Sequence, residues 1–158
     1  MKDPAMSGDT WLTQQVQLLE AAFHRVQDEQ MAEMALANPA LTVEAVGFHR
    51  YQGRPFGALL SPWFLNLILL PGEGEDWERL PERSEQHWAL PAGIYLFHVC
   101  RAAGIGTFQA CSMMSPVERV EDQDTFRMMA EAVLRSVCRP SGHSRRAVLT
   151  GRFDDEGH

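Results

Sequence analysis

The sequence predicts an α+β domain in which an antiparallel β-sheet packs against two long helices, one N-terminal and one C-terminal. Apolar residues recur at helical spacing near both ends, and the segment between them is rich in β-branched and aromatic residues. The chain has 158 residues, 45% of them hydrophobic, enough for one domain with its own core. We expect a flexible N-terminus over residues 1–9, one domain over 10–153 and a flexible tail over 154–158.

The first helix is expected over residues 11–37, with Thr10 as its N-cap. Most of its apolar residues follow at steps of three or four positions, as on the buried face of an amphipathic helix. These residues are Leu12, Val16, Leu19, Phe23, Val26, Met31, Met34 and Ala35. Asn38-Pro39 is expected to end the helix, because the residue before a proline disfavours the helical conformation.

Two antiparallel hairpins are expected in the middle of the chain. The first joins strands over residues 43–51 and 56–60, with its turn at Gln52-Gly53-Arg54-Pro55. The second opens at Leu90-Pro91-Ala92-Gly93 and joins strands over residues 94–100 and 106–112. Between the hairpins, residues 63–70 are almost continuously apolar, which is typical of an element covered on both sides.

The last helix is expected to begin at Ser115-Pro116, since proline is tolerated in a first helical turn. Glu118, Glu121 and Asp122 would then lie at the positive end of the helix dipole. Its core face would carry Phe126, Met129, Ala130, Val133, Leu134 and Val137, and residues 139–142 would end it. Residues 147–149 are expected to form either a short edge strand or an ordered tail.

Composition and charge narrow the classes of partner. The formal net charge of −7 argues against nucleic acid, whose phosphates require a basic surface. It is compatible with a basic peptide, and equally with an acidic surface that serves only solubility. The sequence shows no apolar run of the roughly 20 residues that a membrane span needs and no secretory signal, so we expect no membrane insertion and a cytoplasmic location.

No motif for catalysis, a metal or a cofactor is recognisable. The three cysteines, Cys100, Cys111 and Cys138, form no C-x-x-C pair, and the six histidines have no close metal-ligand spacing. G-x-S-x-G, P-loop and dinucleotide-binding fingerprints are absent. The residues alone therefore identify no catalytic centre, and a small enzyme with a convergent active site is an alternative. Cys111 is expected to be a small buried apolar residue; a reactive thiol near the start of the last helix is the alternative.

Several motifs, in their order and spacing, carry a resemblance to a known family. They are Ser61-Pro62-Trp63-Phe64 with the apolar run after it, Trp77, Leu90-Pro91-x-Gly93, Ala110-Cys111-Ser112-Met113-Met114-Ser115-Pro116 and the closing Arg145-Arg146-Ala147-x-Leu149-x-Gly151-Arg152. The chain resembles the HybE family of nickel–iron hydrogenase assembly chaperones, which includes HupJ-like proteins. The resemblance implies a cytoplasmic chaperone that binds the hydrogenase small-subunit precursor at its twin-arginine leader and delays export until assembly is complete. It also implies that the protein is not an enzyme. The large subunit is a further candidate partner.

The predicted peptide-binding site combines an apolar corner with an acidic turn. An export leader presents an arginine pair followed by an apolar segment, and a groove flanked by carboxylates would complement both. The candidates are Trp63, Phe64, Leu67, Glu73, Asp76 and Trp77, with Met113 and Met114 as an adaptable rim. The alternatives are a tryptophan that only fills the core and an acidic turn that is only solvated. An alternative function is a redox or metal-handling maturation factor that protects iron–sulfur clusters through Cys111.

Overall fold

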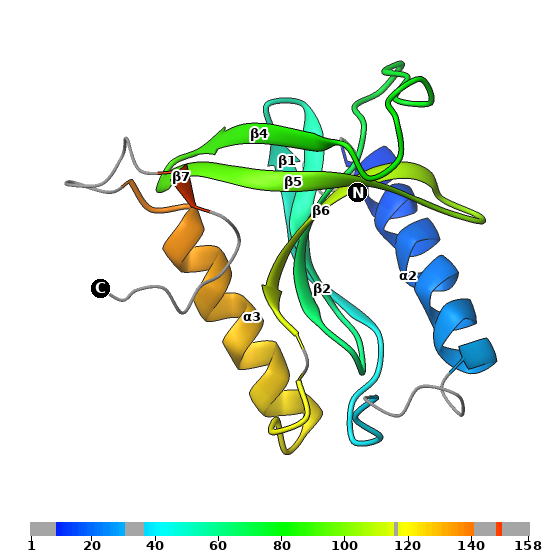
Figure 1. The fold of residues 1–158 in the computed structure, drawn as a ribbon, viewed down its shortest axis with the longest axis vertical. Coiled ribbons are helices and arrows are strands. Elements are labelled where there is room, and N and C mark those ends of the chain that lie inside the picture. Colours follow the sequence, from blue (N-terminus) through cyan, green and yellow to red (C-terminus); the bar gives the residue numbers. More distant parts are fainter. Residues whose placement is uncertain (1–8, 31–36, 116, 141–147, 150–158) are drawn as a thin grey trace, which may run out of the picture.

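The computed structural model describes residues 9–30, 37–115, 117–140 and 148–149 (Figure 1). Two helices and seven strands are defined in this part of the chain. In sequence order they are α2 (Thr10–Gln30), β1 (Glu44–Tyr51), β2 (Arg54–Leu60), β3 (Leu65–Leu69), β4 (Glu85–Leu90), β5 (Gly93–Ala102), β6 (Gly106–Met114), α3 (Gln123–Val137) and β7 (Val148–Leu149). Neither helix is long and apolar enough to span a bilayer.

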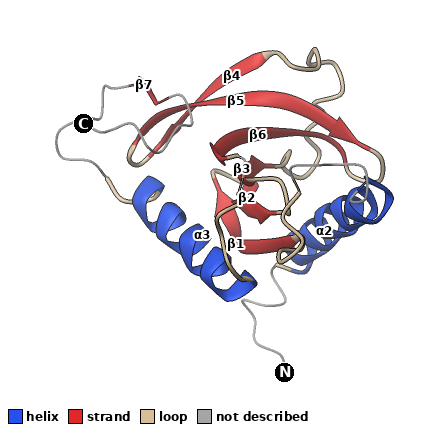
Figure 2. Cartoon of the chain, turned by 60° about the horizontal axis from the view of Figure 1, so that its bottom comes forward, coloured by secondary structure: helices blue, strands red, loops and turns tan. Residues whose placement is uncertain are grey.

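The strands form one strongly curved sheet in the order β1-β2-β3-β6-β5-β4, with every neighbouring pair in this path antiparallel. The short strand β7 pairs with β5 in parallel. The helices α2 and α3 lie on opposite sides of the sheet (Figure 2). The predicted α+β class, an antiparallel sheet packed against two long helices, is confirmed.

The first hairpin follows directly from its turn residues. Gln52 and Gly53 both have positive φ, 54° and 83°, as a two-residue turn that matches the twist of the strands requires. Tyr51 pairs with Arg54 on either side of this turn. The structure thus confirms the hairpin, although β2 begins at Arg54, two residues before the predicted start.

The sheet has a separate hydrophobic core on each face. On the α3 side, Phe126, Ala130, Val133, Leu134 and Val137 pack against Phe56, Leu60, Leu67 and Phe97. On the α2 side, Leu19 packs with Leu59, Ile68 and Phe108. Strands β2 and β3 are therefore covered on both faces, which explains why their sequences are apolar without alternation.

Both helices differ in extent from the prediction. Helix α2 is described as far as Gln30, residues 31–36 lie outside the described part, and Ala37, the predicted last residue of the helix, is not helical. Helix α3 begins at Gln123 rather than at Ser115, because the side chain of Asp122 caps it by accepting a hydrogen bond of 2.7 Å from the backbone N–H of Thr125. The chain before the cap is a loop, pinned by the buried Asn38 amide, which donates to the carbonyl oxygens of Val117 and Val120.

Strand β4 is absent from the prediction, which assigned no structure to residues 84–89. It is an edge strand, and its residues alternate between exposed and partly buried. Glu85, His87 and Ala89 are its exposed residues. Trp88 and Leu90 are the large apolar residues of this strand. Two such residues are too few to show the alternation of apolar and polar positions by which a strand is recognised in a sequence. The predicted strand at residues 147–149 is confirmed for Val148–Leu149, and residue 147 lies outside the described part.

Candidate functional site

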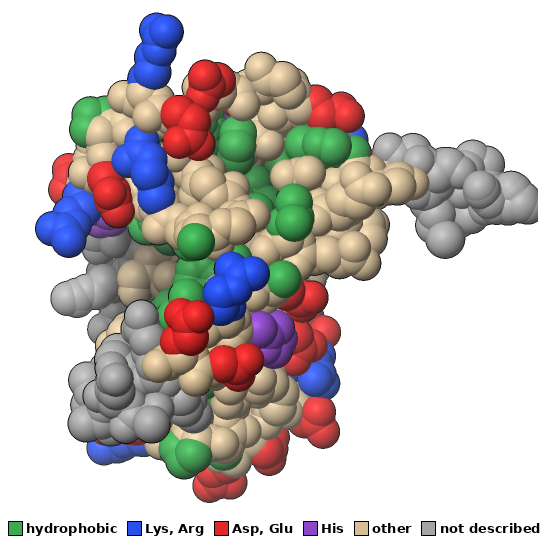
Figure 3. Space-filling model, turned by 90° about the vertical axis from the view of Figure 1, so that its right-hand side faces the viewer, with side chains coloured by type: hydrophobic (Ala, Val, Ile, Leu, Met, Phe, Trp, Pro, Cys, Tyr) green, Lys and Arg blue, Asp and Glu red, His purple; other side chains and the backbone are tan. Residues whose placement is uncertain are grey.

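The apolar corner before β3 is a tight turn held by Ser61. The Ser61 hydroxyl accepts hydrogen bonds from the backbone N–H groups of Trp63 (3.1 Å) and Phe64 (3.2 Å). Phe64 is half-buried and meets Phe23 of α2 edge-on, with ring centroids 6.1 Å apart. The Trp63 indole N–H is buried without a hydrogen-bond partner among the described residues. Figure 3 shows the side of the molecule that carries α2. Hydrophobic side chains are exposed in the middle of this face, and charged side chains lie around them.

Two of the predicted site residues belong to the core instead of to a surface. Leu67 is fully buried in the middle of β3. Trp77 is 7% exposed and packs against Trp88, with ring centroids 6.2 Å apart. In this structure neither side chain is available to contact a peptide, because each fills space between the sheet and its covering elements.

The acidic turn after β3 is engaged in contacts within the protein. The Arg54 guanidinium donates two hydrogen bonds of 2.9 Å to the Glu75 carboxylate, and these bonds are the main reason that the pKa of Glu75 is lowered. Glu73 lies 3.7 Å from Arg50, and Asp76 accepts a hydrogen bond from the backbone N–H of Glu78. Both Glu73 and Asp76 are otherwise exposed. Arg50 and Arg54 of the same chain therefore neutralise part of the negative charge of this turn.

The predicted site residues do not form one surface. Phe64 belongs to the core cluster on the α2 side of the sheet. Met113 and Met114 belong to the α3 side, together with Leu67 and Trp77. Strand β6 places Met113 and Met114 at its end, where the chain crosses toward α3. The sheet thus lies between Phe64 of the apolar corner and the two methionines.

The methionines line an open apolar groove between the end of β6 and helix α3. One part of the groove has a volume of about 530 Å³, and its lining includes Met114, Val117, Val120, Thr125 and Met129. A second part of about 210 Å³ is lined by Leu65, Met113, Met114, Met129, Ala132 and Val133. Because Met114 and Met129 line both parts, the groove follows α3 from Thr125 to Val133, about 12 Å at 1.5 Å per residue.

The wider part of the groove carries charged side chains. Glu118, Arg119 and Glu121 belong to its lining, and all three are exposed. No described residue forms an ion pair with Glu118 or Glu121. The groove therefore combines an apolar floor with two carboxylates that form no ion pair with any described residue.

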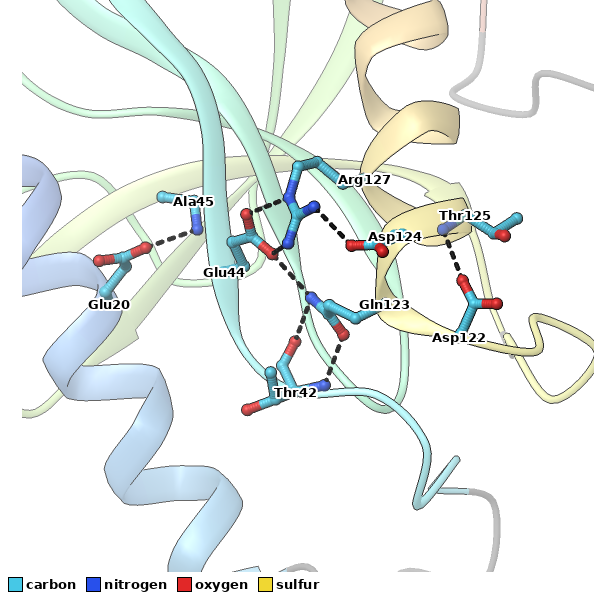
Figure 4. A network of polar contacts seen from close by, with 9 residues as sticks. All are labelled: Glu20, Thr42, Glu44, Ala45, Asp122, Gln123, Asp124, Thr125 and Arg127. Carbon is cyan, nitrogen blue, oxygen red and sulfur yellow. Dashed lines mark hydrogen bonds and ion pairs between the residues drawn. The ribbon is translucent and has the colours of Figure 1, made fainter.

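A polar network fixes α3, and with it one wall of the groove, to the edge of the sheet (Figure 4). Arg127 donates to both oxygens of Glu44 on β1, at 2.6 and 3.1 Å, and to Asp124 at 2.9 Å. Gln123 bonds the same Glu44 carboxylate and both backbone groups of Thr42. The hydrogen bonds from Arg127 lower the pKa of Glu44, so the carboxylate stays ionised at neutral pH.

The sequence predicted Met113 and Met114 but missed the rest of this groove. Met129 was expected only on the core face of a helix, and Glu118 and Glu121 only near a helix dipole. One signal was present in the sequence: four of the eight methionines, Met113, Met114, Met128 and Met129, fall within 17 residues. Methionine is flexible and polarisable, and it is common on surfaces that adapt to apolar partners.

Cys111 lacks the properties of a reactive thiol. It is fully buried on β6, and burial raises the pKa of its thiol to about 12, so it carries almost no thiolate at neutral pH. The described residues include no group of three or more His, Cys, Asp or Glu side chains able to hold a metal ion. The burial of Cys111 and the raised pKa of its thiol argue against the alternative of a reactive thiol at this position.

Comparisons with known proteins agree with this fold and place the chain in a family. The chain is 37% identical over 131 residues to the probable rubredoxin HupJ of Rhodobacter capsulatus, covering 83% of this chain but 47% of that protein, so it spans about half of that relative's length. It is 35% identical over 134 residues to the hydrogenase expression/formation protein HupT of Azotobacter chroococcum mcd 1, covering 83% and 87% of the two chains.

The solution structure of HybE from Escherichia coli has the same fold, with a TM-score of 0.64 and 23% identity over 87% of this chain and 90% of that one. Residues 14–151 match the family model described as NiFe-hydrogenase assembly chaperone, HybE. The match covers most of the chain, including the whole sheet, helix α3 and the groove between them. The chain therefore belongs to the HybE family of nickel–iron hydrogenase assembly chaperones.

Proposed function

We propose that this chain is a cytoplasmic chaperone that binds the small-subunit precursor of a nickel–iron hydrogenase through its twin-arginine leader. By holding the leader, it delays export until assembly is complete, and it catalyses no reaction. The observation that carries this proposal is the open methionine-lined groove along α3, combined with membership of an assembly-chaperone family.

The groove suits the apolar segment of a leader. Its narrower part is lined by apolar side chains alone, contributed by β3, β6 and α3. Burying such side chains contributes roughly 25 cal/mol per Å² of apolar surface removed from water. The flexible side chains of Met114 and Met129 can adjust to the shape of an incoming apolar segment. A site of this size supports binding that is reversible, which delayed release requires.

Charge favours a basic partner at the same place. Glu118, Arg119 and Glu121 lie at the wider part of the groove, so two carboxylates outweigh one guanidinium there, and the whole chain has a formal net charge of −7. An arginine-bearing leader would be attracted toward this surface, and the attraction would weaken as salt is added.

The direct test is titration of the purified protein with a fluorescently labelled synthetic peptide that carries the small-subunit leader. Met129→Glu places a charge in the middle of the groove and should weaken binding at least tenfold. Met128→Glu is the matched control, because Met128 neighbours it on α3 but is 64% exposed and lines neither part of the groove. Equal affinity for the two variants would refute the groove as the leader site.

A second experiment asks which part of the precursor is held. The chaperone is co-purified with the small subunit expressed with and without its leader, and separately with the large subunit. Loss of the small subunit when the leader is removed supports leader recognition. Retention of the leaderless subunit, or capture of the large subunit alone, would move the contact to a mature subunit.

A further inference from the structure

Strands β5 and β6 form a fork. They pair from Ala102 and Gly106 up to His98 and Ala110, and beyond that pair they separate. The first half of β5 continues beside β4, while the last residues of β6 continue beside β3. Helix α3 lies across the open side of the fork: in Figure 1, β5 crosses the top of the view, β6 descends from it, and α3 faces both. We call the edge of β5 that faces β6, and the edge of β6 that faces β5, the inner edges of the fork. Beyond His98 and Ala110 these two edges no longer pair with each other.

The chain's own C-terminal segment occupies one of these inner edges. Val148 and Leu149 form β7, which pairs in parallel with Ile94 and Tyr95 of β5. The inner edge of β6 over residues 111–114 has no strand partner in the described part of the chain. Backbone groups at an open edge of this kind are the usual template for addition of an extended peptide.

The sequence of this segment is unusual for the protein. Arg145-Arg146-Ala147-Val148-Leu149 is an arginine pair followed by apolar residues, in a chain whose net charge is −7. An arginine pair followed by an apolar segment is also what a twin-arginine leader presents. The two residues that pair with β5 therefore follow, in the sequence, an arginine pair and an alanine, which is the order of residue types in the partner proposed above.

The geometry points to the inner edge of β5 at Ile94 and Tyr95 as a docking slot for an extended arginine-pair peptide, with β7 as an internal occupant that the leader displaces. The identity of the displacing partner rests on the proposed function. The slot itself rests on the fork and on the strand already paired there.

The slot continues into the methionine groove. A peptide that runs parallel to β5 moves toward the fork at His98, where β6 blocks a straight course. The open edge of β6 then leads outward through Met113 and Met114, which line the groove beside α3. A leader could therefore place its arginine-pair segment along β5 and the apolar segment that follows it in the groove.

The occupant is suited to displacement. As a strand of two residues, β7 makes few ladder bonds, whereas a longer peptide that also fills the groove would make more contacts. Pairing of β7 with β5 would then lower the apparent affinity for weak or incomplete ligands, because binding must compete with β7.

The experiment uses the full-length protein with Val148→Pro and Leu149→Pro together. Successive strand residues direct their N–H groups to opposite sides, so replacing both removes the N–H donor to β5 whichever residue supplies it. Glu156→Pro, seven residues beyond the strand, is the control. The double variant should bind the labelled leader peptide at least tenfold more tightly than the wild type, and the control should match the wild type. Equal leader affinity for the double variant and the wild type would overturn the slot and leave the proposed function standing.

A second arm does not depend on the leader. A synthetic peptide of residues 143–152 is added to the double-proline variant, and amide hydrogen exchange at Ile94 and Tyr95 is followed by NMR. Binding should slow exchange there, and the peptide with Arg145→Ala and Arg146→Ala should bind at least tenfold more weakly. A peptide that fails to bind overturns the slot. If the double-proline variant binds this peptide but does not bind the leader peptide, the slot is confirmed and the proposed function is refuted.

Discussion

The guanidinium of Arg54 lies between the carboxylate of Glu75, which accepts two hydrogen bonds of 2.9 Å from it, and the ring of Trp88, whose centroid is 4.8 Å away. One side chain of β2 thereby ties the turn after β3 to edge strand β4. This contact also means that the Glu75 carboxylate is not free to bind an arginine of another chain.

Arg54→Lys should lower the free energy of unfolding by about 1–2 kcal/mol, because lysine can reproduce neither the two parallel hydrogen bonds nor the planar stacking on Trp88. Urea denaturation followed by tryptophan fluorescence measures the change. Arg79→Lys is the control: Arg79 is exposed, and no described residue forms an ion pair with it. Equal stability of the two variants would mean that the Arg54 contact contributes nothing to stability.

Charge reversal separates the two possible locations of the leader site. Glu118→Lys with Glu121→Lys should weaken leader binding severalfold and flatten its dependence on salt, because these carboxylates belong to the groove and form no ion pair within the described part of the chain. Glu73→Lys with Asp76→Lys changes the charge equally at the predicted acidic turn and should leave the salt dependence of binding almost as steep. If the Glu73→Lys, Asp76→Lys variant instead shows the weaker binding and the flatter salt dependence, the leader site lies at the corner near Trp63.

Gly57→Ala should destabilise the protein by about 3 kcal/mol. An added Cβ would lie 2.8 Å from the Cα atom of Phe48 and 2.6 Å from two of its ring carbons, and the backbone of β1 cannot withdraw without breaking the hairpin. Gly74→Ala serves as the control. Gly74 has a φ of 77° but no atom within 4 Å of an added Cβ, so only backbone strain of about 1 kcal/mol is expected there. Thermal unfolding of both variants checks the difference.

Stability should fall as the solution becomes alkaline. Burial raises the pKa of Cys111 and of Tyr95 to about 12, above their ordinary values in an unfolded chain. Each group then holds its proton longer in the folded protein, so its contribution is fully present below the unfolded pKa and is lost as pH rises toward 12. The expected loss is on the order of 1 kcal/mol per pH unit for each group.

Urea midpoints at pH 7, 9 and 10.5 measure this loss. Cys111→Ala should remove the cysteine's share and give a flatter profile than the wild type. A wild-type midpoint that does not change up to pH 10.5 would contradict the burial of both groups.

The sequence was sufficient for elements whose signals are local. Gln52-Gly53 requires positive φ at both positions, so the first hairpin was predictable from two residues. The core face of α3 was also correct, since Phe126, Ala130, Val133, Leu134 and Val137 are all buried as their helical spacing indicates. The start of α3 was not predictable in this way, because the loop before it is held by Asn38, about 80 residues earlier in the chain.

The candidate site was harder to predict for a physical reason. A strand covered on both sides is apolar on both faces, so its sequence does not reveal which residues point to which helix. Nothing in the local sequence distinguishes the face of Phe64 from that of Met113, and only the sheet order separates them. The groove depends on the place where β6 ends relative to α3, which is a tertiary relationship.

The division of the interior into two cores by one sheet has a consequence for how the molecule can move. Since Leu19 and Phe126 belong to different clusters, losses of packing at these two positions should add without coupling. A substitution that loosens the layer under α3 should therefore leave the packing of the layer under α2 unchanged.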